Sequence, residues 1–338
     1  MINRKGRYTL VFSDGPKILS FASVAGPKEA QGPLGNKFDK IFYDPKAGKE
    51  TWEQAESQLQ KESLGLAISK AQLHSADIDF IFSGDLLNQC ISSSYGLKDF
   101  SIPYLGQYGA CSTMAQTLIM GAITLESKAA RLCACVTSSH FCSAERQYRF
   151  PLEYGGQRTP TAQWTVTGSG CCILGSDKSA HLRISGATVG RITDLGVTDA
   201  NNMGAAMAPS AAQTLLDFFS DTGKSPEDFD RIFTGDLGYV GSKLLYALTE
   251  KQGLNIREKH RDCGLLIFDR DLQDVHAGGS GCGCAASVLC SHILRKLKEG
   301  KYKNVLFVAT GALMSPTSCQ QGQSIPCVAH LVHLSSDK

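Results

Sequence analysis

The sequence predicts an α/β protein in which two duplicated halves stack as five alternating αβαβα layers. The segment Ile81-Phe-Ser-Gly-Asp-Leu86 reappears as Ile232-Phe-Thr-Gly-Asp-Leu237, and each copy resembles an apolar strand that ends at a glycine turn. A predicted helix that opens with Cys111 or Cys282 follows each copy, and each helix leads into another apolar strand. One order of elements that occurs twice indicates duplication. Strands that alternate with helices indicate sheets covered on both faces.

The first half contains each of these elements in turn. Residues 51–54, Thr-Trp-Glu-Gln, fit a capping box, in which the threonine side chain bonds free amides at a helix start. We expect this helix to run toward Leu73. After the strand at 81–86, apolar residues recur on one helical face from Met114 to Ala122. The apolar segment 131–136 is the strand that follows.

The second half repeats this plan. Residues 207–219 occupy the place of the first predicted helix, and apolar residues from Ala285 to Leu294 follow the helix start at Cys282. The apolar segment 304–308 is the strand that follows. The repeat therefore predicts two α/β halves with a site where they meet.

The repeat also suggests a division of the chain. We assign residues 1–185 to the N-terminal half and residues 186–338 to the C-terminal half. Helical and strand periodicity both fail over residues 138–168, which are rich in charged and aromatic side chains. Long inserts in compact domains are often functional. We interpret this insert as part of a binding site, as a dimer-forming arm, or as both.

Composition narrows the classes of function. The chain has 338 residues, of which 42% are hydrophobic and 20% charged, so it can bury a large core. Its formal net charge is only +2, which does not give the basic field that non-specific nucleic-acid binding needs. No stretch approaches the roughly 18 apolar residues that cross a bilayer. We expect a soluble chain that reaches a membrane only through a partner.

The chain has thirteen cysteines, and no two of them form a C-x-x-C pair. Many lie in apolar runs, where a free cysteine behaves as a small buried hydrophobe. We interpret most of them as core residues in a reducing compartment. The spacing gives little support to a metal site, and we expect none.

Cys111 is the leading candidate for chemistry. It opens a predicted helix, where free amides and the positive end of the helix dipole stabilise a thiolate and lower the pKa of a thiol. Such a cysteine is a candidate nucleophile. The alternative is a small residue packed at a tight junction between a strand and a helix.

Several longer strings carry a family resemblance. The duplicated plan with Gly-Ala-Cys-Ser at the first central helix resembles the thiolase and ketoacyl synthase superfamily. A closer resemblance, to the stage V sporulation protein AD family, runs from about residue 20 to the C-terminus. Its strings include residues 25–39, 84–89, 144–157, 165–170, 203–209, 262–267, 277–282 and 308–317.

This resemblance implies a thiolase-like fold and a function in endospore-forming bacteria. The family binds dipicolinic acid and belongs to the machinery that moves this compound, with calcium, across the spore inner membrane in sporulation and germination. The resemblance further implies a peripheral location at that membrane, contact with membrane proteins of the stage V sporulation A transport complex, and a homodimer.

Thiolase-type catalysis requires a base for the thiol and donors for the thioester oxyanion. The superfamily supplies these from the second half, often in a His-Pro-x-Gly-x-Ser-Gly string. This chain has residues 276–281, His-Ala-Gly-Gly-Ser-Gly, which are one residue short and lack the proline. Residues 234–237 correspond to the turn that carries a histidine in the synthases, but they contain no histidine. Residues 309–312 correspond to the loop that carries the terminal cysteine of thiolases, but they contain no cysteine.

Three functions therefore stay open. The first is a non-catalytic binding protein for dipicolinate or its calcium chelate, without a cofactor. The second is an acyltransferase or ketoacyl synthase that uses Cys111 on an acyl thioester. The third is a structural subunit with a vestigial cleft. We favour the first, because the nucleophile position is retained while its partners are not.

Dipicolinate is a flat ring with two carboxylates, so it needs donors at both ends and a platform. Arginine matches a carboxylate with two parallel hydrogen bonds, and the insert supplies Arg146, Arg149 and Arg158. The alternative role of Arg146 and Arg149 is pairing with Glu145 and Glu153. The ring could stack on Tyr148 or Phe150. We predict these ligand-binding residues: Asp85, Asn88, Cys111, His140, Arg146, Arg149, Ser169, His260, Gly279, Ser280 and Gly311.

Overall fold

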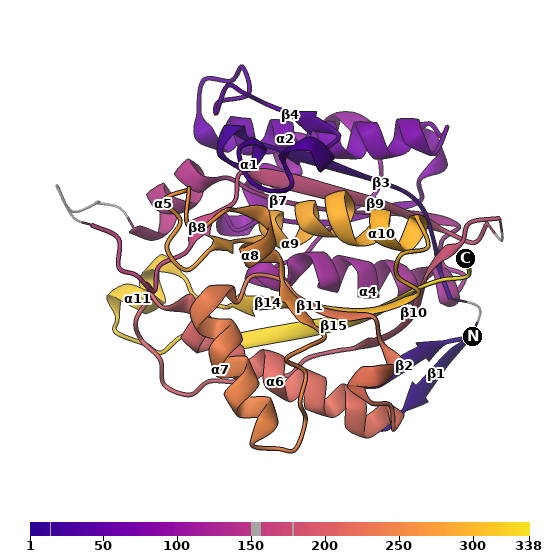
Figure 1. The fold of residues 1–338 in the computed structure, drawn as a ribbon. Coiled ribbons are helices and arrows are strands. Elements are labelled where there is room, and N and C mark those ends of the chain that lie inside the picture. The colour runs from indigo at the N-terminus through magenta and orange to yellow at the C-terminus, as the bar shows by residue number, and fades with distance from the viewer. Residues whose placement is uncertain (14, 150–156, 178) are drawn as a thin grey trace.

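A computed structural model describes residues 1–13, 15–149, 157–177 and 179–338. Its strands form two half-sheets with the same order and directions (Figure 1). The first half-sheet runs in the order β3 (Lys17–Ala25), β9 (Gly168–Gly175), β7 (Leu132–Ser139), β5 (Phe80–Gly84) and β6 (Tyr104–Gly106). The second runs in the order β10 (Leu182–Thr188), β15 (Cys327–Ser336), β14 (Asn304–Ala312), β11 (Arg231–Thr234) and β12 (His260–Asp262).

Strand directions confirm the duplication that the repeat predicts. In each half the second strand is antiparallel to both neighbours, and the last three strands are parallel. The half-sheets meet where β3 pairs with β10 at Lys17 and Arg183. The boundary that we place at 185/186 stays a prediction.

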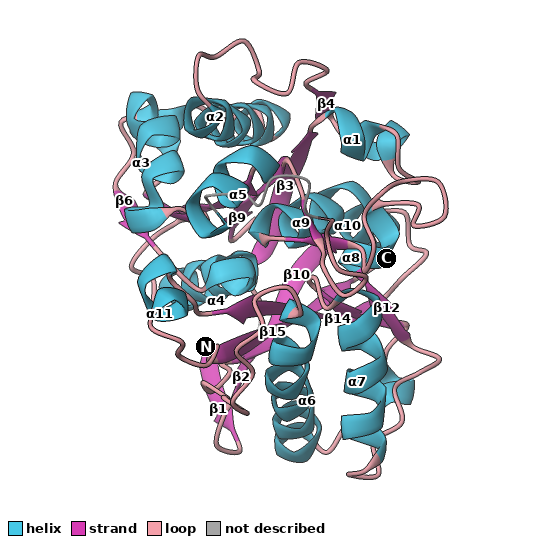
Figure 2. Cartoon of the chain, turned by 90° about the vertical axis from the view of Figure 1, so that its left-hand side faces the viewer, coloured by secondary structure: helices cyan, strands magenta, loops and turns pink. Residues whose placement is uncertain are grey.

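Helices fill the layers above, between and below the half-sheets (Figures 1 and 2). The outer layers contain α2 (Trp52–Lys70) with α3 (Ile91–Leu97) on one side, and α6 (Met203–Thr222) with α7 (Gly238–Glu250) on the other (Figure 2). The middle layer contains α4 (Thr113–Glu126) and the run formed by α9 (Cys282–Val288), a π-helical turn (Leu289–Ile293) and α10 (Leu294–Lys298). The five-layered arrangement is therefore confirmed.

Shorter elements complete the chain. They are β1 (Ile2–Lys5), β2 (Thr9–Phe12), α1 (Pro27–Ala30), β4 (Lys40–Ile41), α5 (Phe141–Arg149), β8 (Trp164–Thr165), α8 (Cys263–Ile267), β13 (Gly279–Ser280) and α11 (Pro316–Gln320). The predicted insert is thus not irregular throughout, because it contains α5 and β8. Within α5, Ser143 and Ala144 are buried, so tertiary packing stabilises a helix that the sequence pattern does not reveal.

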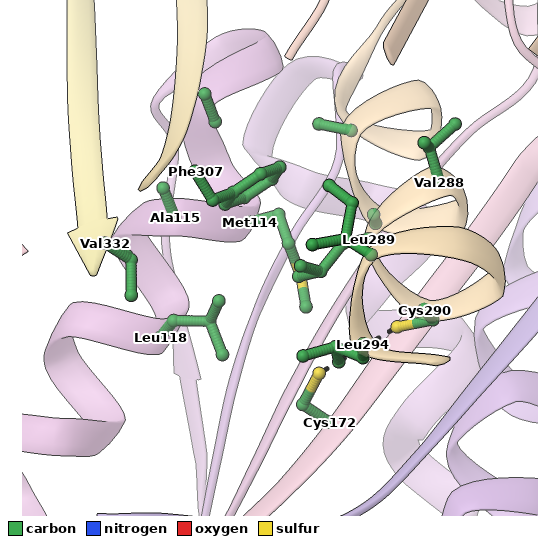
Figure 3. Close-up of a cluster of buried hydrophobic side chains, with 14 of the residues drawn as sticks. Met114, Ala115, Leu118, Cys172, Val288, Leu289, Cys290, Leu294, Phe307 and Val332 are labelled. Carbon is green, nitrogen blue, oxygen red and sulfur yellow. Dashed lines mark hydrogen bonds between the residues drawn. The ribbon is translucent and has the colours of Figure 1, made fainter. Parts of the chain in front are cut away.

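The core lies between the half-sheets, around the central helices (Figure 3). Met114 and Leu118 of α4 and Leu289 of the π-helical turn are all fully buried, and Phe307 of β14 closes the cluster from the sheet. This packing follows from two apolar helices that lie between two apolar sheet faces. The cysteines are free, and all but Cys142 and Cys319 are buried, as predicted.

Two predicted helices have different limits in the structure. The first is α2, which begins after Thr51 and ends at Lys70; the Thr51 side chain accepts a hydrogen bond from the Gln54 amide, as the capping box predicts. The second, α6, begins four residues before the predicted start at 207, because Asn202 caps it by accepting from the Ala205 amide. In the described part of the chain, the longest and most apolar helices still fall short of what a membrane crossing needs.

Candidate functional site

A pocket lies where the two halves meet, beside the starts of the central helices. Its empty volume is about 610 Å³ and it opens to solvent. The walls come from both halves and are mostly apolar, with a few hydroxyls and one thiol. The lining residues are Leu86, Tyr108, Ala110, Cys111, Ala144, Tyr148, Thr165, Ala200, Met203, Met207, Ser280, Ala312 and Met314. Of the residues predicted from sequence, Cys111 and Ser280 line it, and so does Tyr148, a predicted platform for the ring.

A close backbone approach positions Cys111. The residue lies in a short 3-10 turn, Ala110–Ser112, directly before α4. Gly311 of β14 lies against this turn, and a Cβ atom at Gly311 would lie only 2.1 Å from the Gly109 carbonyl oxygen. Gly311, which we predicted as a ligand residue, therefore has a clear positioning role: it lets the second half-sheet touch the loop that carries Cys111.

The Cys111 thiol lies beside the Asp236 carboxylate, close enough for the two groups to change each other's pKa. Asp236 is fully buried and accepts from the Gly281 amide at 2.8 Å, from Thr310 Oγ1 at 2.8 Å and from Ser280 Oγ at 3.2 Å. One carboxylate of the second half thereby joins the starts of both central helices.

This environment contradicts the low thiol pKa that the helix terminus predicts. Burial raises the pKa of Cys111 well above its usual range, and the neighbouring Asp236 charge raises it further. A buried carboxylate beside a thiol disfavours a second negative charge, and this outweighs the helix terminus. Cys111 is therefore a protonated thiol near neutral pH.

The two histidines predicted at the site bond elsewhere. His140 Nε2 lies 2.8 Å from the Pro45 carbonyl oxygen, and the His140 ring lies beside Trp52. His260 bonds Thr234 Oγ1 and the Tyr246 hydroxyl, each at 2.8 Å. Burial lowers the pKa of His260 to about 3, so it is neutral. Both imidazoles are therefore engaged away from Cys111.

Asp85, the first-half counterpart of Asp236, lies behind the pocket wall. It is fully buried and accepts from the Leu87 amide at 2.9 Å and from the Ser93 hydroxyl at 2.6 Å. Glu56 lies nearby and accepts from Ser143 Oγ at 2.6 Å. Burial and the Asp85 charge raise the pKa of Glu56 to about 8. Asp85 thus organises a turn and a helix start, and its carboxylate does not line the pocket.

Two predicted ligand residues line a neighbouring hollow instead. Asn88 and Arg146 share its walls with Glu53 and Gln147. The Arg146 guanidinium pairs with Glu53 at 2.7 Å, and the Asn88 amide donates to the Gln147 side chain at 2.8 Å. An arginine that pairs with an acid was one of our two predictions, but its acid is Glu53 of α2 and not a residue of the insert.

The other predicted residues are scattered. The Ser169 hydroxyl donates to the Thr137 carbonyl oxygen at 2.9 Å in the first half-sheet, and the Gly279 carbonyl accepts from Gln163 at 2.8 Å. The Arg158 guanidinium lies 4.9 Å from the centre of the Trp164 ring. The Arg149 side chain and Phe150 lie outside the described residues.

Sequence reasoning missed part of the pocket. Tyr108, Met203, Met207 and Met314 line it, and Asp236 lies beside its thiol. The repeat contained one usable signal, because it places Asp236 at the same turn as Asp85. The methionines carry no such signal, because an apolar helix face has the same sequence pattern whether it packs in a core or lines a cavity.

Comparison with known proteins shows the family. The model of the family described as "Stage V sporulation protein AD (SpoVAD)" matches residues 6–335. The chain belongs to this family. A curated relative, stage V sporulation protein AD of Bacillus subtilis (strain 168), is 45% identical over 325 residues, which cover 96% of each protein. The chain is thus a sporulation protein, as its sequence strings indicate.

Solved structures show the fold. The chain is similar to 3-oxoacyl-[acyl-carrier-protein] synthase III from Aquifex aeolicus VF5, with a TM-score of 0.57 and 14% identity over 95% of this chain and 100% of that chain. It is also similar to acetamide-bound OleA of Xanthomonas campestris, with a TM-score of 0.60 and 12% identity over 99% of this chain and 100% of that chain. The predicted thiolase-like fold is confirmed. At these identities the similarity shows fold alone.

Proposed function

We propose that this sporulation protein is a non-catalytic, thiolase-fold binding protein for dipicolinic acid or its calcium chelate. It would hold the ligand in the pocket between the halves and serve its transport across the spore inner membrane in sporulation and germination. The observation that carries the proposal is the state of Cys111. Burial and the neighbouring Asp236 carboxylate raise the pKa of its thiol, and the predicted histidines are engaged elsewhere.

The pocket has features that suit a flat aromatic acid. Tyr108 and Tyr148 line it, and their hydroxyl oxygens lie 3.1 Å apart. Burial raises the pKa of Tyr108 to about 12, so its phenol stays neutral; the Tyr148 hydroxyl donates to the Leu86 carbonyl oxygen, which leaves it to accept from Tyr108. Thr165 and Ser280 add hydroxyls on the other wall. Aromatic rings give a platform, and hydroxyls and free amides at a helix start can meet carboxylates.

The alternative is an acyltransferase or ketoacyl synthase that uses Cys111 on an acyl thioester. The apolar wall favours this reading, because Met203, Met207 and Met314 would suit an acyl chain. The high thiol pKa opposes it, since the thiolate is the nucleophile. Chemistry at this cysteine would first require the proton to leave for a base.

We further propose a homodimer that docks on membrane proteins of the stage V sporulation A complex and lies peripherally at the spore inner membrane. The dimer has support in β6. Among the strands of the described residues, β6 pairs with β5 alone, and it leaves Tyr104 and Leu105 exposed by 38% and 49%. An unpaired edge with apolar side chains is a template for pairing with another chain.

Calorimetric titration tests the binding function. Purified protein is titrated with dipicolinate, with and without calcium, and separately with acetyl-coenzyme A. Saturable dipicolinate binding without a response to the thioester supports the proposal. Binding of the thioester alone, with a mass-spectrometric acyl adduct on Cys111, contradicts it and supports the acyltransferase.

Three variants locate the ligand. Cys111→Phe fills the pocket and should abolish binding, whereas Cys319→Phe changes a half-buried cysteine outside the lining and should not. Arg146→Ala tests the predicted arginine contact. Normal affinity in Cys111→Phe, with the protein folded, would move the ligand out of this pocket.

A further inference from the structure

A second hollow lies far from Cys111, along the edge of β3. Its walls are Leu19, Ser20, Phe21, Asp39, Lys70, Arg295, Lys298 and Glu299, around an empty volume of about 910 Å³. On this edge β3 pairs with β4 at Val24 and Ala25 and with β10 at Lys17. The hollow therefore fills the gap between those two pairings.

Positive side chains reach the hollow from both faces of the sheet. Lys70 ends α2 in the outer layer, and Arg295 and Lys298 lie on α10 in the central layer (Figure 1). The chain is unusually basic here, because the cations Arg295, Lys296, Lys298, Lys301 and Lys303 lie close together in sequence. In α10, fully buried Leu294 and Leu297 anchor the helix and direct its basic residues outward.

Asp39 fixes two of the cations in place. Its Oδ1 lies 2.7 Å from both Lys70 Nζ and Arg295 Nη2. The Ser23 amide donates to its other oxygen at 2.9 Å. Because the carboxylate is itself held by the backbone, it orients the two long side chains beside the hollow, which lowers the entropy cost of binding an anion there.

The local charge stays positive after these pairings. Lys70 and Arg295 share a single carboxylate. Glu299, the other acid of the wall, pairs with Lys301 at 2.8 Å. Lys298 has no carboxylate within ion-pair distance in the described ranges, and its Nζ lies 6.0 Å from the centre of the Phe21 ring. The cations Lys70, Arg295, Lys298 and Lys301 thus outnumber the carboxylates of Asp39 and Glu299 by four to two, which leaves a local charge of +2.

We propose that this hollow, between the end of α2 and α10 at the β3 edge, binds a phosphate group with Lys70, Arg295 and Lys298. Lysine and arginine together supply point charges and a planar donor pair, which suit the several oxygens of a phosphate. The phosphate belongs to a phospholipid headgroup or to a free phosphorylated compound. Both sources present the same chemistry to these side chains.

The site is independent of the pocket. Cys282 at one end of the α9–α10 run adjoins the pocket region, and Lys298 at the other end lines the hollow. At roughly 1.5 Å per residue, the two ends of that run are about 25 Å apart. A phosphate in the hollow therefore leaves the mouth of the pocket open.

Vesicle sedimentation and calorimetry test the proposal and separate the two sources. Full-length protein is mixed with phosphatidylcholine vesicles, with and without phosphatidylglycerol, at low and high salt. A parallel arm titrates inorganic pyrophosphate. Salt-sensitive binding that requires phosphatidylglycerol supports a lipid headgroup, and binding of pyrophosphate alone supports a free phosphate compound.

Matched variants locate the binding. Lys298→Gln should weaken it about five-fold, and it disturbs no carboxylate pair in the described ranges. Lys70→Gln should weaken it similarly, with the thermal midpoint checked because Lys70 also bonds Asp39. Lys251→Gln, an exposed lysine at the end of α7, is the control. The proposal is overturned if neither probe binds, or if Lys251→Gln loses as much affinity as Lys298→Gln.

Discussion

The Asp236 carboxylate lies beside the thiol of Cys111, although the two residues belong to different halves of the duplicated fold. The same carboxylate holds the Gly281 amide at the start of the second central helix. A single buried acid thus fixes the geometry of the junction and keeps the thiol protonated. A protonated thiol suits the pocket-wall role that we propose for Cys111.

Cys111 should therefore react slowly with alkylating agents. At neutral pH we expect iodoacetamide to modify Cys111 at least about ten-fold more slowly than the half-buried Cys319, because little thiolate forms beside a carboxylate. Peptide-level mass spectrometry measures both rates in one sample. Preferential labelling of Cys111 would contradict the high thiol pKa.

A variant at Asp236 distinguishes two causes of slow labelling at Cys111: the negative charge beside the thiol, and the limited access of iodoacetamide to it. Asp236→Asn removes the negative charge and keeps an oxygen acceptor, so the pKa of Cys111 should fall and its labelling should accelerate. Asp177→Asn, at an exposed aspartate, is the control and should leave the rate unchanged. An unchanged rate in Asp236→Asn would show that access alone limits the reaction.

The fold could be predicted because its evidence is local and occurs twice. Two repeated features indicate the duplication: the Gly-Asp turns at Asp85 and Asp236, and the cysteines that open the two central helices. Hydrophobic periodicity predicts most of the helices and strands. The ends of the helices are harder to predict than the helices themselves, because Asn202 caps α6 ahead of the predicted start. A helix cap is a single side-chain contact, and the same apolar segment offers several residues at which a helix could begin.

The pocket was harder to predict because its contacts are long-range. Cys111 was found from its helix start, but the effect of Asp236 on its pKa depends on burial, which the sequence does not show. Arg146 was expected to meet a ligand or an acid of the insert, and it meets Glu53 of α2. The choice between partners depends on how α5 packs, which periodicity leaves open.

Gly311→Ala should disturb the junction. The new Cβ would lie 2.1 Å from the Gly109 carbonyl oxygen, so the Cys111 turn or β14 must shift. We expect a loss of about 1–3 kcal/mol in unfolding free energy, measured by urea denaturation. Gly65→Ala in α2 meets only the Phe100 ring edge at 4.0 Å and should instead gain about 0.5–1 kcal/mol. Equal stability of the two variants would refute the close approach.

The β6 edge should govern self-association. Leu105→Lys places a charge on the unpaired strand, where a second copy would have to bury it, so the proposed dimer should dissociate into monomers. Sedimentation velocity measures the change in mass. Leu272→Lys changes a residue that is 85% exposed on a distant loop and should leave association intact. A wild-type monomer at micromolar concentration would contradict the proposed dimer.

Glu56 should make stability depend on pH. Burial raises its pKa from the ordinary 4.5 to about 8 in the folded protein. Between those values the folded chain keeps a proton that the unfolded chain releases, so this stabilisation is complete below pH 4.5 and is lost as pH rises toward about 8. Glu56→Gln cannot titrate. The unfolding free energy of wild type minus that of Glu56→Gln should therefore fall steadily across this range.

Subtracting the unfolding free energy of Glu56→Gln from that of the wild type isolates the contribution of Glu56 from groups whose effect on stability has the opposite pH dependence. Burial lowers the pKa of His330 and of His333 to about 4, so both disfavour folding as pH falls below their ordinary value of 6.5. These contributions occur in both proteins and cancel in the difference. Gln252→Ala, at an exposed side chain that cannot titrate, should give a difference that does not change with pH. A flat difference for Glu56→Gln as well would show that Glu56 is ionised in the folded protein throughout, with Ser138 and Ser143 donating to a carboxylate.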